Sequence, residues 1–179
     1  MTHSTTTTAN DSPSIYIACL AAYNNGKLHG AWIDATEDPD AIRESIQTML
    51  AASPEPDAEE WALHDHEGFY GLHLSEWESI DDLHAYATVI ADHGKLGALV
   101  LEYIDYNPDE AEFMLEECYA GCYSSLDDFA QELLEETTKI PQNLAYYIDY
   151  ERMGRDMAMN GDVTTFETAH DEVHIFWQR

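Results

Sequence analysis

The sequence predicts an α+β protein with small antiparallel sheets. Short runs of alternating apolar residues occur near both ends of the chain, and amphipathic patterns of helical period fill much of the rest. An Asn-Gly turn between two of the alternating runs is a strong hairpin signal, which favours antiparallel pairing. With 45% hydrophobic residues, a chain of 179 residues can bury a core, so disorder of the whole chain is not expected.

An α+β domain is expected over residues 14–76. A strand at residues 14–22 and a second at 28–34 flank Asn24-Asn25-Gly26, and together they are predicted to form a hairpin. A third strand, at residues 59–66, is expected to join this hairpin. The three strands therefore predict one small sheet.

The same domain is predicted to contain one helix between its second and third strands. Asp38 caps this helix and Pro39 occupies its first position, where a proline is tolerated. The proline-containing segment at residues 53–56 ends the helix. Its buried face is expected to consist of four residues at helical spacing: Ile42, Ile46, Met49 and Leu50.

A mainly helical domain is expected over residues 77–116. A capping pair that begins at Ser79 is typical of a helix start, and this first helix is predicted to break near Gly94. A second helix is expected at residues 95–105. A third, acidic helix begins at Asp109.

The last domain, residues 117–179, is again predicted to be α+β. Ser125 begins a second capping pair, ahead of a helix that Pro141 ends. A further helix is expected at residues 143–159. The remaining elements are predicted to be extended: a segment at 117–123 and two closing strands at 163–168 and 172–177.

The charge balance excludes several classes of partner. Asp and Glu number 36 against 7 Lys and Arg, which gives a formal net charge of −29. Such a charge repels nucleic acid and anionic lipid, so we expect no direct nucleic-acid binding and no membrane partner. No apolar run approaches the roughly 20 residues that span a bilayer. Any partner is therefore expected to be cationic, and the protein could also act without one.

The cysteines and the N-terminus predict where the protein is found. Three cysteines, an odd count without a CxxC pair, give no disulfide framework and fit a reducing cytoplasm. Residues 1–13 lack the apolar core of a signal peptide and are expected to be a disordered polar tail. Cys118 and Cys122 have no cation beside them to lower a thiol pKa, so we interpret both as buried small apolar residues.

The sequence contains no recognisable catalytic or cofactor motif. It lacks a P-loop, a dinucleotide fingerprint, a Gly-x-Ser-x-Gly and a His-Glu-x-x-His pattern. His64-Asp65-His66 offers metal-ligand chemistry, but a second ligand cluster is missing, and we interpret these histidines as surface residues. We therefore predict no enzyme activity, no cofactor and no metal site.

The placement of the carboxylates is more informative than their number. They lie along nearly every predicted helix and loop rather than in one tail. On the helix after Ser125, Asp128, Glu132 and Glu135 are expected to face outward about one turn, or roughly 5.4 Å, apart. Like charges at that spacing destabilise a helix slightly, so the arrangement costs stability and requires an explanation. The predicted acidic surface consists of Glu37, Asp38, Asp40, Asp57, Glu59, Glu60, Glu76, Glu78, Asp81, Asp82, Glu110, Glu112, Glu116, Glu117, Asp127, Asp128, Glu132, Glu135 and Glu136.

Composition leaves three interpretations of this acidic surface open. Duplex DNA carries one negative charge per about 1.7 Å, so the net charge matches roughly 50 Å, or about 15 base pairs, and the surface could imitate DNA. It could instead belong to a general acidic binding module for a basic partner. Adaptation to high salt, or simple solubility, also produces acidic surfaces.

Two blocks of sequence resemble the ArdA antirestriction family. The first block is Ile15-Tyr16-Ile17-Ala18, Tyr23-Asn24-Asn25-Gly26, Leu28, Gly30, Trp32 and Asp34. The second block is Leu133-Leu134-Glu135-Glu136, Ile140-Pro141, Leu144, Tyr147-Ile148-Asp149-Tyr150-Glu151 and Gly154-Arg155-Asp156. The resemblance extends from about Ile15 to Trp177, and between the two blocks it rests on helical character and acidity.

The resemblance implies an elongated, curved chain of three small domains whose carboxylates imitate the phosphates of bent B-form DNA. Proteins of this family inhibit type I restriction-modification enzymes by occupying the DNA groove of the specificity and modification subunits, without catalysis. They are carried by mobile genetic elements that enter bacteria, so the implied location is the cytoplasm of a bacterial host. Glu135 and Glu136 fall in the segment that corresponds to the family's antirestriction motif.

The resemblance also implies a homodimer formed through the last domain. We expect the extended stretch at residues 118–123 to pair across the dimer, with Tyr119 and Tyr123 at its exposed edge. Tyr147, on the following helix, is interpreted as a packing residue because of its helical spacing. Arg152 is a rare cation in this chain and is expected to pair with a local carboxylate.

Overall fold

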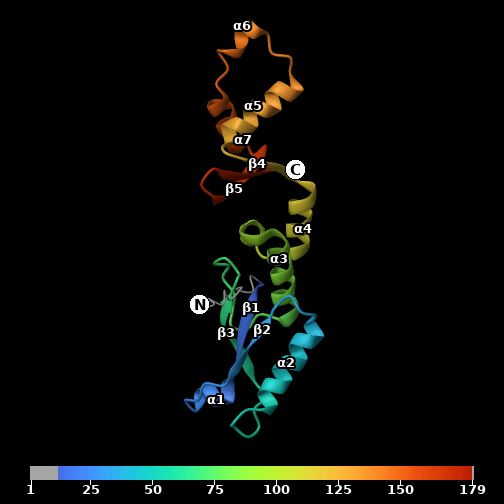
Figure 1. Cartoon of the computed structure of the whole chain (residues 1–179), viewed down its shortest axis with the longest axis vertical. Coiled ribbons are helices and arrows are strands. Elements are labelled where there is room, and N and C mark those ends of the chain that lie inside the picture. Colours follow the sequence, from blue (N-terminus) through green and yellow to red (C-terminus); the bar gives the residue numbers. More distant parts are fainter. Residues whose placement is uncertain (1–11, 179) are drawn as a thin grey trace, which may run out of the picture. The chain divides into compact units, whose positions relative to one another are not determined.

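The computed structural model describes residues 12–178, and the chain divides into two compact units (Figure 1). The N-terminal unit ends at Ala98 and the C-terminal unit begins at Leu99. The described residues form seven helices and two three-stranded antiparallel sheets, which confirms the α+β class. The division into three small domains stays a prediction.

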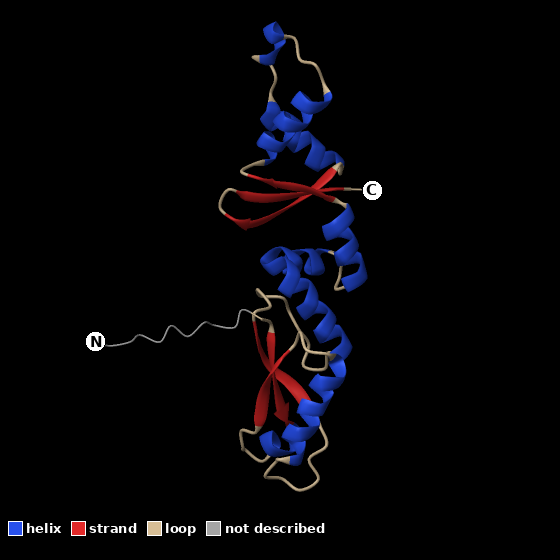
Figure 2. Cartoon of the chain, turned by 45° about the vertical axis from the view of Figure 1, so that its right-hand side comes forward, coloured by secondary structure: helices blue, strands red, loops and turns tan. Residues whose placement is uncertain are grey.

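The N-terminal unit is built on a small antiparallel sheet (Figure 2). The strand order in this sheet is β2-β1-β3. Its strands are β1 (Ser14–Cys19), β2 (Gly30–Asp34) and β3 (Trp61–Glu67), and both pairings are antiparallel. The predicted pairing of the first two strands is therefore confirmed, but their connection is longer than a tight hairpin turn. The chain forms the short helix α1 (Leu20–Asn24) before Gly26 turns it at φ 72°, a left-handed conformation that suits glycine.

The first described residues already belong to the N-terminal unit. The Ser12 hydroxyl donates to the Asp34 carboxylate at 2.9 Å, and the Pro13 carbonyl accepts a hydrogen bond from the Ala35 N–H at 2.9 Å. The prediction of a polar tail up to residue 13 is therefore wrong for these two residues. The rest of that prediction, residues 1–11, lies outside the described residues.

Helix α2 (Pro39–Ala51) packs against the sheet of this unit. Asp38 caps the helix, because its carboxylate accepts a hydrogen bond from the Asp40 backbone N–H at 2.9 Å. The core lies between the helix and β1, whose Ile15 and Ile17 are fully buried. The predicted inner face of the helix is confirmed by four buried side chains: Ile42, Ile46, Met49 and Leu50.

Helix α3 (Ile80–Tyr103) starts and bends where the sequence predicts. The Ser79 hydroxyl accepts a hydrogen bond from the Asp82 N–H at 3.1 Å, so the capping pair is confirmed. The helix is kinked at Gly94, where φ is 58° and ψ is −140°. An L side chain rarely adopts this conformation, and glycine therefore marks the break.

The C-terminal unit is built on a second sheet, with the strand order β4-β6-β5. Helix α4 (Pro108–Glu117) precedes this sheet, and the Asn107 side chain caps it. Phe129, Val163 and Ile175 form the buried centre of the unit. The other elements, in chain order, are β4 (Tyr119–Tyr123), α5 (Leu126–Thr137), α6 (Gln142–Ala145), α7 (Tyr150–Asn160), β5 (Val163–Ala169) and β6 (Glu172–Trp177).

The single helix predicted at residues 143–159 is wrong, because this stretch contains a break. The chain turns at Tyr146 and Tyr147 and is irregular up to Asp149. The Asp149 carboxylate then accepts a hydrogen bond from the Arg152 N–H at 2.9 Å and caps α7 as a new helix. An Asx cap inside an otherwise periodic stretch thus divides it into α6 and α7.

The two cysteines around β4 differ in their exposure. Cys118 is buried as predicted, but Cys122 is exposed and that prediction is wrong. Side chains alternate along a strand, and the Tyr123 ring packs on Phe129 of α5 at a centroid distance of 5.2 Å. Cys122 therefore points to the face of the sheet that α5 does not cover.

Candidate functional site

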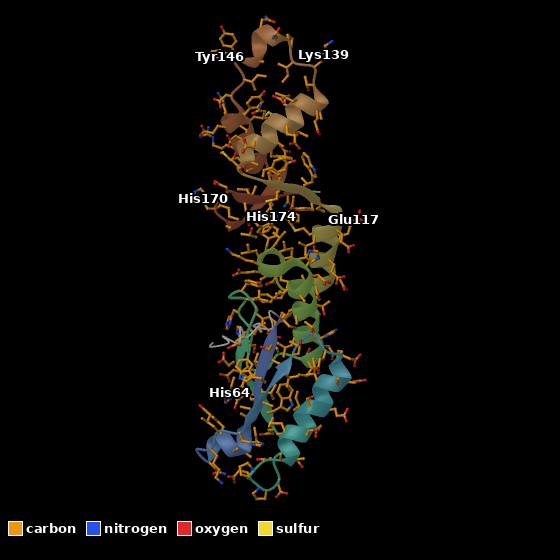
Figure 3. The ribbon with its side chains drawn as sticks, viewed as in Figure 1. His64, Glu117, Lys139, Tyr146, His170 and His174 are labelled. Carbon is orange, nitrogen blue, oxygen red and sulfur yellow. The ribbon has the colours of Figure 1, made fainter. Side chains whose placement is uncertain are left out.

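The predicted acidic surface is exposed in both units. All of its carboxylate residues are exposed except Glu78, which is half-buried, and no charged side chain in the described part of the chain is buried. This follows from the cost of moving an ionised group out of water. Figure 3 shows one of them, Glu117, on α4.

In the N-terminal unit, one cation lies within the acidic surface. The Arg43 guanidinium donates to the Asp40 carboxylate at 3.0 Å and also to Asp81 near the start of α3. The hydrogen bond with Asp81 is the largest cause that raises the pKa of Arg43 above its usual value. Exposed pairs of this kind contribute little to stability, so Arg43 chiefly neutralises part of the surface.

In the C-terminal unit, helix α5 carries a dense run of carboxylates. The Ser125 hydroxyl caps the helix by accepting a hydrogen bond from the Asp128 N–H at 3.2 Å, as predicted. Phe129 and Ala130 are buried, so the acidic positions face outward. A shallow groove of about 330 Å³ is lined by Asp128, Gln131, Glu132, Glu135 and Glu136. The structure thus brings four residues of the predicted surface together on one helix.

Neutral donors hold two of these carboxylates in place. The Tyr123 hydroxyl donates to Glu132 at 2.9 Å, and the Gln131 amide donates to Glu135 at 2.9 Å. Burial is the largest cause that raises the pKa of Tyr123, and its bond to Glu132 adds to the effect. Because tyrosine and glutamine carry no positive charge, the two carboxylates are oriented without being neutralised.

The predicted dimer residues lie on an edge strand. Among the described strands, β4 pairs only with β6, so its other side is open. Tyr119 is 40% exposed, and its hydroxyl donates to His174 Nδ1 at 2.9 Å. Both tyrosine hydroxyls therefore have partners within the unit, while the outer backbone edge of β4 is unpaired in the described structure.

Sequence reasoning missed an exposed apolar segment around α6. Tyr146 is 91% exposed, Tyr147 79% and Leu144 51%, so the interpretation of Tyr147 as a packing residue is wrong. The break before Asp149 takes these side chains off the face of α7. Arg152 does pair locally, with Asp156 at 3.7 Å. The Asp149 cap is the sequence signal that could have identified this segment.

The histidines considered as metal ligands lie on the surface of the N-terminal unit. The His64 ring packs edge-on against Tyr23 at a centroid distance of 4.6 Å. Within residues 12–178, no group of three or more His, Cys, Asp or Glu side chains has the geometry to hold a metal ion. In that same range, no helix is both long and apolar enough to cross a bilayer.

These observations define a class of small α+β proteins that bury an apolar core and expose a strongly acidic surface. A family model with the description Antirestriction protein (ArdA) matches residues 15–172. The chain therefore belongs to the ArdA antirestriction family. A search of curated proteins found no match to the sequence.

Proposed function

We propose that this protein is a DNA mimic that blocks the restriction of incoming mobile DNA by type I restriction-modification enzymes. Its acidic surface occupies the DNA-binding groove of the specificity and modification subunits, and it inhibits by occupancy rather than by catalysis. Membership of the ArdA family supports the antirestriction role. The target acts on DNA that enters a bacterial cell, so the proposed location is the cytoplasm of the host.

The charge density of α5 is the observation that carries this proposal. Five carboxylates occur within the ten residues from Asp127 to Glu136. At about 1.5 Å of rise per residue, this is about one charge per 3 Å of helix axis. One strand of B-form DNA carries one charge per about 3.4 Å. The outer side of this helix therefore matches the charge density of a DNA strand.

The fixed position of these charges distinguishes the protein from a flexible polyanion. Phe129 and Ala130 anchor α5 to its unit, and neutral donors orient Glu132 and Glu135. A preorganised array loses less conformational entropy on binding than a disordered acidic chain. Inhibition should therefore depend on the folded structure as well as on the net charge.

Phage plating tests the proposed function in cells. We expect unmodified phage to plate efficiently on a host with a type I system when the protein is expressed, because the host enzyme cannot bind the incoming DNA. The matched host without that system should show no change. Undiminished restriction would refute the proposal. Capture of unrelated basic proteins from a lysate that lacks a type I system would instead favour a general acidic binding module.

The proposed assembly is a homodimer that pairs through the open edge of β4. An unpaired strand edge is a template for strand pairing with a second copy. Tyr119→Asp places a charge at this edge, and we expect the variant to sediment as a monomer in analytical ultracentrifugation. Tyr119→Phe is the matched control, since it keeps the ring against Phe176 and should remain dimeric. An unchanged dimer in the Tyr119→Asp variant would exclude this interface.

A further inference from the structure

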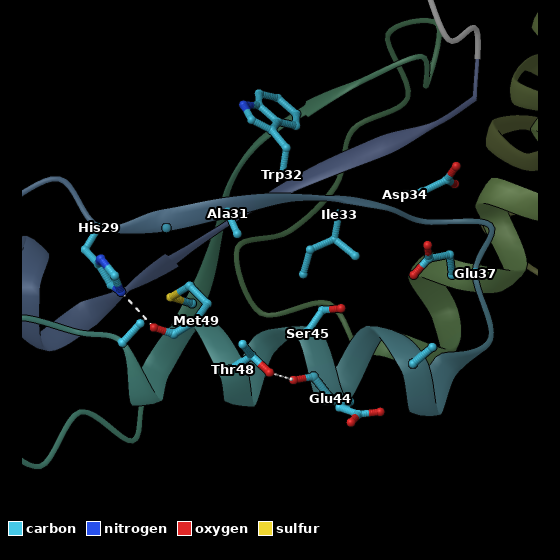
Figure 4. Close-up of a pocket in the computed structure, with 13 residues that line it drawn as sticks. His29, Ala31, Trp32, Ile33, Asp34, Glu37, Glu44, Ser45, Thr48 and Met49 are labelled. Carbon is cyan, nitrogen blue, oxygen red and sulfur yellow. Dashed lines mark hydrogen bonds between the residues drawn. The ribbon is translucent and has the colours of Figure 1, made fainter.

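A groove of about 690 Å³ lies between strand β2 and helix α2 in the N-terminal unit (Figure 4). Among the described strands, β2 is an outer strand of its sheet and pairs only with β1. Ala31 and Ile33 point from the strand towards the helix, whereas Trp32 points to the opposite side. One wall of the groove is therefore the edge of a sheet, and the other wall is the flank of a helix.

The free edge of β2 offers backbone groups for a further strand. The Cys19 N–H donates to the His29 carbonyl at 2.9 Å, and the Ala35 N–H donates to the Pro13 carbonyl, also at 2.9 Å. In an antiparallel ladder the bonded positions alternate, so the odd-numbered residues of β2 face β1. The N–H and C=O groups of Gly30 and Trp32 then face the open edge. Such a row of groups is what an added strand pairs with.

The helix wall leaves room for that strand. The side chains on this flank of α2 and just after it are small, and they recur at helical spacing: Ala41, Ser45, Thr48 and Ala52. The large apolar residues of α2 lie on its neighbouring face, where they pack on the sheet. A new strand would lie about 4.8 Å from β2, and small side chains at this flank accommodate it.

The rim of the groove is acidic. Asp34, Glu37 and Glu44 line it, and none of the lining residues is a lysine or arginine. Burial acts to raise the pKa of Asp34, but hydrogen bonds from Thr36 and Ser12 outweigh it and hold the pKa below its usual value. The rim is therefore negative at neutral pH and complementary to cationic side chains.

We propose that this groove binds an extended, lysine- or arginine-bearing segment of a protein partner, which adds to β2 as a fourth strand. Side chains on one face of the segment lie over Ala41 and Ser45. Their long aliphatic stems carry the terminal cationic groups to Glu37 and Glu44. Side chains on the other face flank the ring of Trp32, which is 47% exposed and can attract a cation. This interaction goes beyond DNA mimicry, which requires carboxylates but no strand edge.

A model peptide tests the groove without any restriction enzyme, so the result is independent of the proposed antirestriction function. The probe is an acetylated and amidated peptide of eight alternating lysines and valines, titrated into the full chain at about 0.15 M salt, which limits non-specific attraction. We expect the amide resonances of Gly30 and Trp32 to shift. A peptide of equal charge that is N-methylated at alternate residues should bind about tenfold more weakly, because it cannot pair with the strand edge.

Matched variants separate the strand edge from the charge. Trp32→Pro removes one outward N–H and should weaken binding about tenfold, whereas Trp32→Ala keeps the N–H and should weaken it less. Glu37→Gln with Glu44→Gln should also weaken binding. The matched control, Glu112→Gln with Glu116→Gln in α4, should leave peptide binding unchanged.

Three results would overturn the proposal. The first is equal binding of the methylated and unmethylated peptides, and the second is a shift pattern that avoids Gly30 and Trp32. The third is β2-to-β2 pairing of two copies, seen as a mass that rises with protein concentration and falls in Trp32→Pro. If Trp32→Pro does not fold, Ser45→Arg provides the second variant, because it fills the helix wall with a long cationic side chain and should abolish binding.

Discussion

At the scale of single residues, His174 connects three side chains in the C-terminal unit. The Tyr119 hydroxyl donates to Nδ1 at 2.9 Å, and Nε2 lies 2.9 Å from the Thr168 hydroxyl, which itself donates to Glu172. A neutral imidazole with its proton on Nε2 satisfies all of these contacts. Burial lowers the pKa of His174, although the nearby Glu172 acts in the opposite direction.

This lowered pKa predicts a pH dependence of stability. The unfolded state takes up a proton near pH 6.5 while the folded state resists it, so the stabilising contribution of His174 is lost as the pH falls through this range. Protonation also removes the acceptor at Nδ1 that Tyr119 uses. In urea unfolding from pH 7.5 to 5.0, we expect wild type to lose more free energy of unfolding than His174→Gln. Parallel pH curves for the two proteins would contradict this role.

The surroundings of Gly154 leave little room for a side chain. It is buried in α7, and an added Cβ would lie 2.9 Å from the Leu126 carbonyl oxygen and 3.0 Å from Leu126 Cγ. Alanine gains about 1 kcal/mol of helix propensity, but overpacking costs about 1–3 kcal/mol. We expect Gly154→Ala to destabilise the unit by about 1 kcal/mol in chemical denaturation.

The control for Gly154 is a change on the exposed side of the same helix. Ala158→Gly removes a methyl group from an exposed position and should cost about 1 kcal/mol through propensity alone. Its denaturation curve measures how much helix propensity alone changes the free energy of unfolding in α7. A Gly154→Ala protein that is more stable than wild type would show that α5 and α7 have room to separate.

At the scale of elements, local chemistry explains what the sequence could predict. Side-chain oxygens at Asp38, Ser79 and Ser125 fix the starts of three helices, because each cap acts within three residues of its position. The short helix α1 could not be predicted in the same way, since an Asn-Gly pair suits a tight turn equally well. Apolar spacing continues across residues 146–149, so periodicity alone did not show the break before α7.

The acidic surface was predictable for a different reason. An ionised carboxylate without a partner stays in water wherever it occurs. Once apolar spacing identifies the inner face of a helix, its carboxylates can therefore be assigned to the outer face. The groove beside β2 was not predictable, because it depends on which strand lies at the edge of the sheet. That order arises from long-range pairing of β1 with β3, which no local pattern encodes.

The carboxylates of helix α5 are expected to contribute directly to inhibition. A variant with Asp128→Asn, Glu135→Gln and Glu136→Gln removes three charges from the groove on α5. If this helix matches a DNA strand, inhibition of a type I enzyme should weaken about tenfold or more, because interface charges control association. The readout is the concentration of protein that halves DNA cleavage by the purified enzyme.

The matched control removes the same number of exposed charges from other places. The control variant carries Asp92→Asn, Glu151→Gln and Glu167→Gln. These three exposed residues lie outside the predicted acidic surface. This variant should inhibit nearly as well as wild type, provided that both variants unfold at similar temperatures. Equal losses in the two variants would mean that net charge, rather than its placement on α5, determines inhibition.

At the scale of the whole molecule, a net charge of −29 acts against folding. Like charges repel more strongly in the compact state than in the unfolded chain, and salt screens this repulsion over about 10 Å at 0.1 M. We expect the unfolding temperature to rise with added sodium chloride. The native far-ultraviolet circular dichroism spectrum should persist at low salt, because both units bury apolar side chains. Loss of structure at low salt would favour a salt-adapted protein of another function.

Competition with duplex DNA tests DNA mimicry most directly. The purified methyltransferase core of a type I enzyme, with its specificity and modification subunits, is titrated with this protein at several concentrations of labelled duplex. Mimicry predicts that the apparent inhibition constant rises in proportion to the duplex concentration, and that unstructured polyglutamate of equal charge inhibits far more weakly. Inhibition that is independent of the duplex concentration, or equal inhibition by polyglutamate, would contradict it.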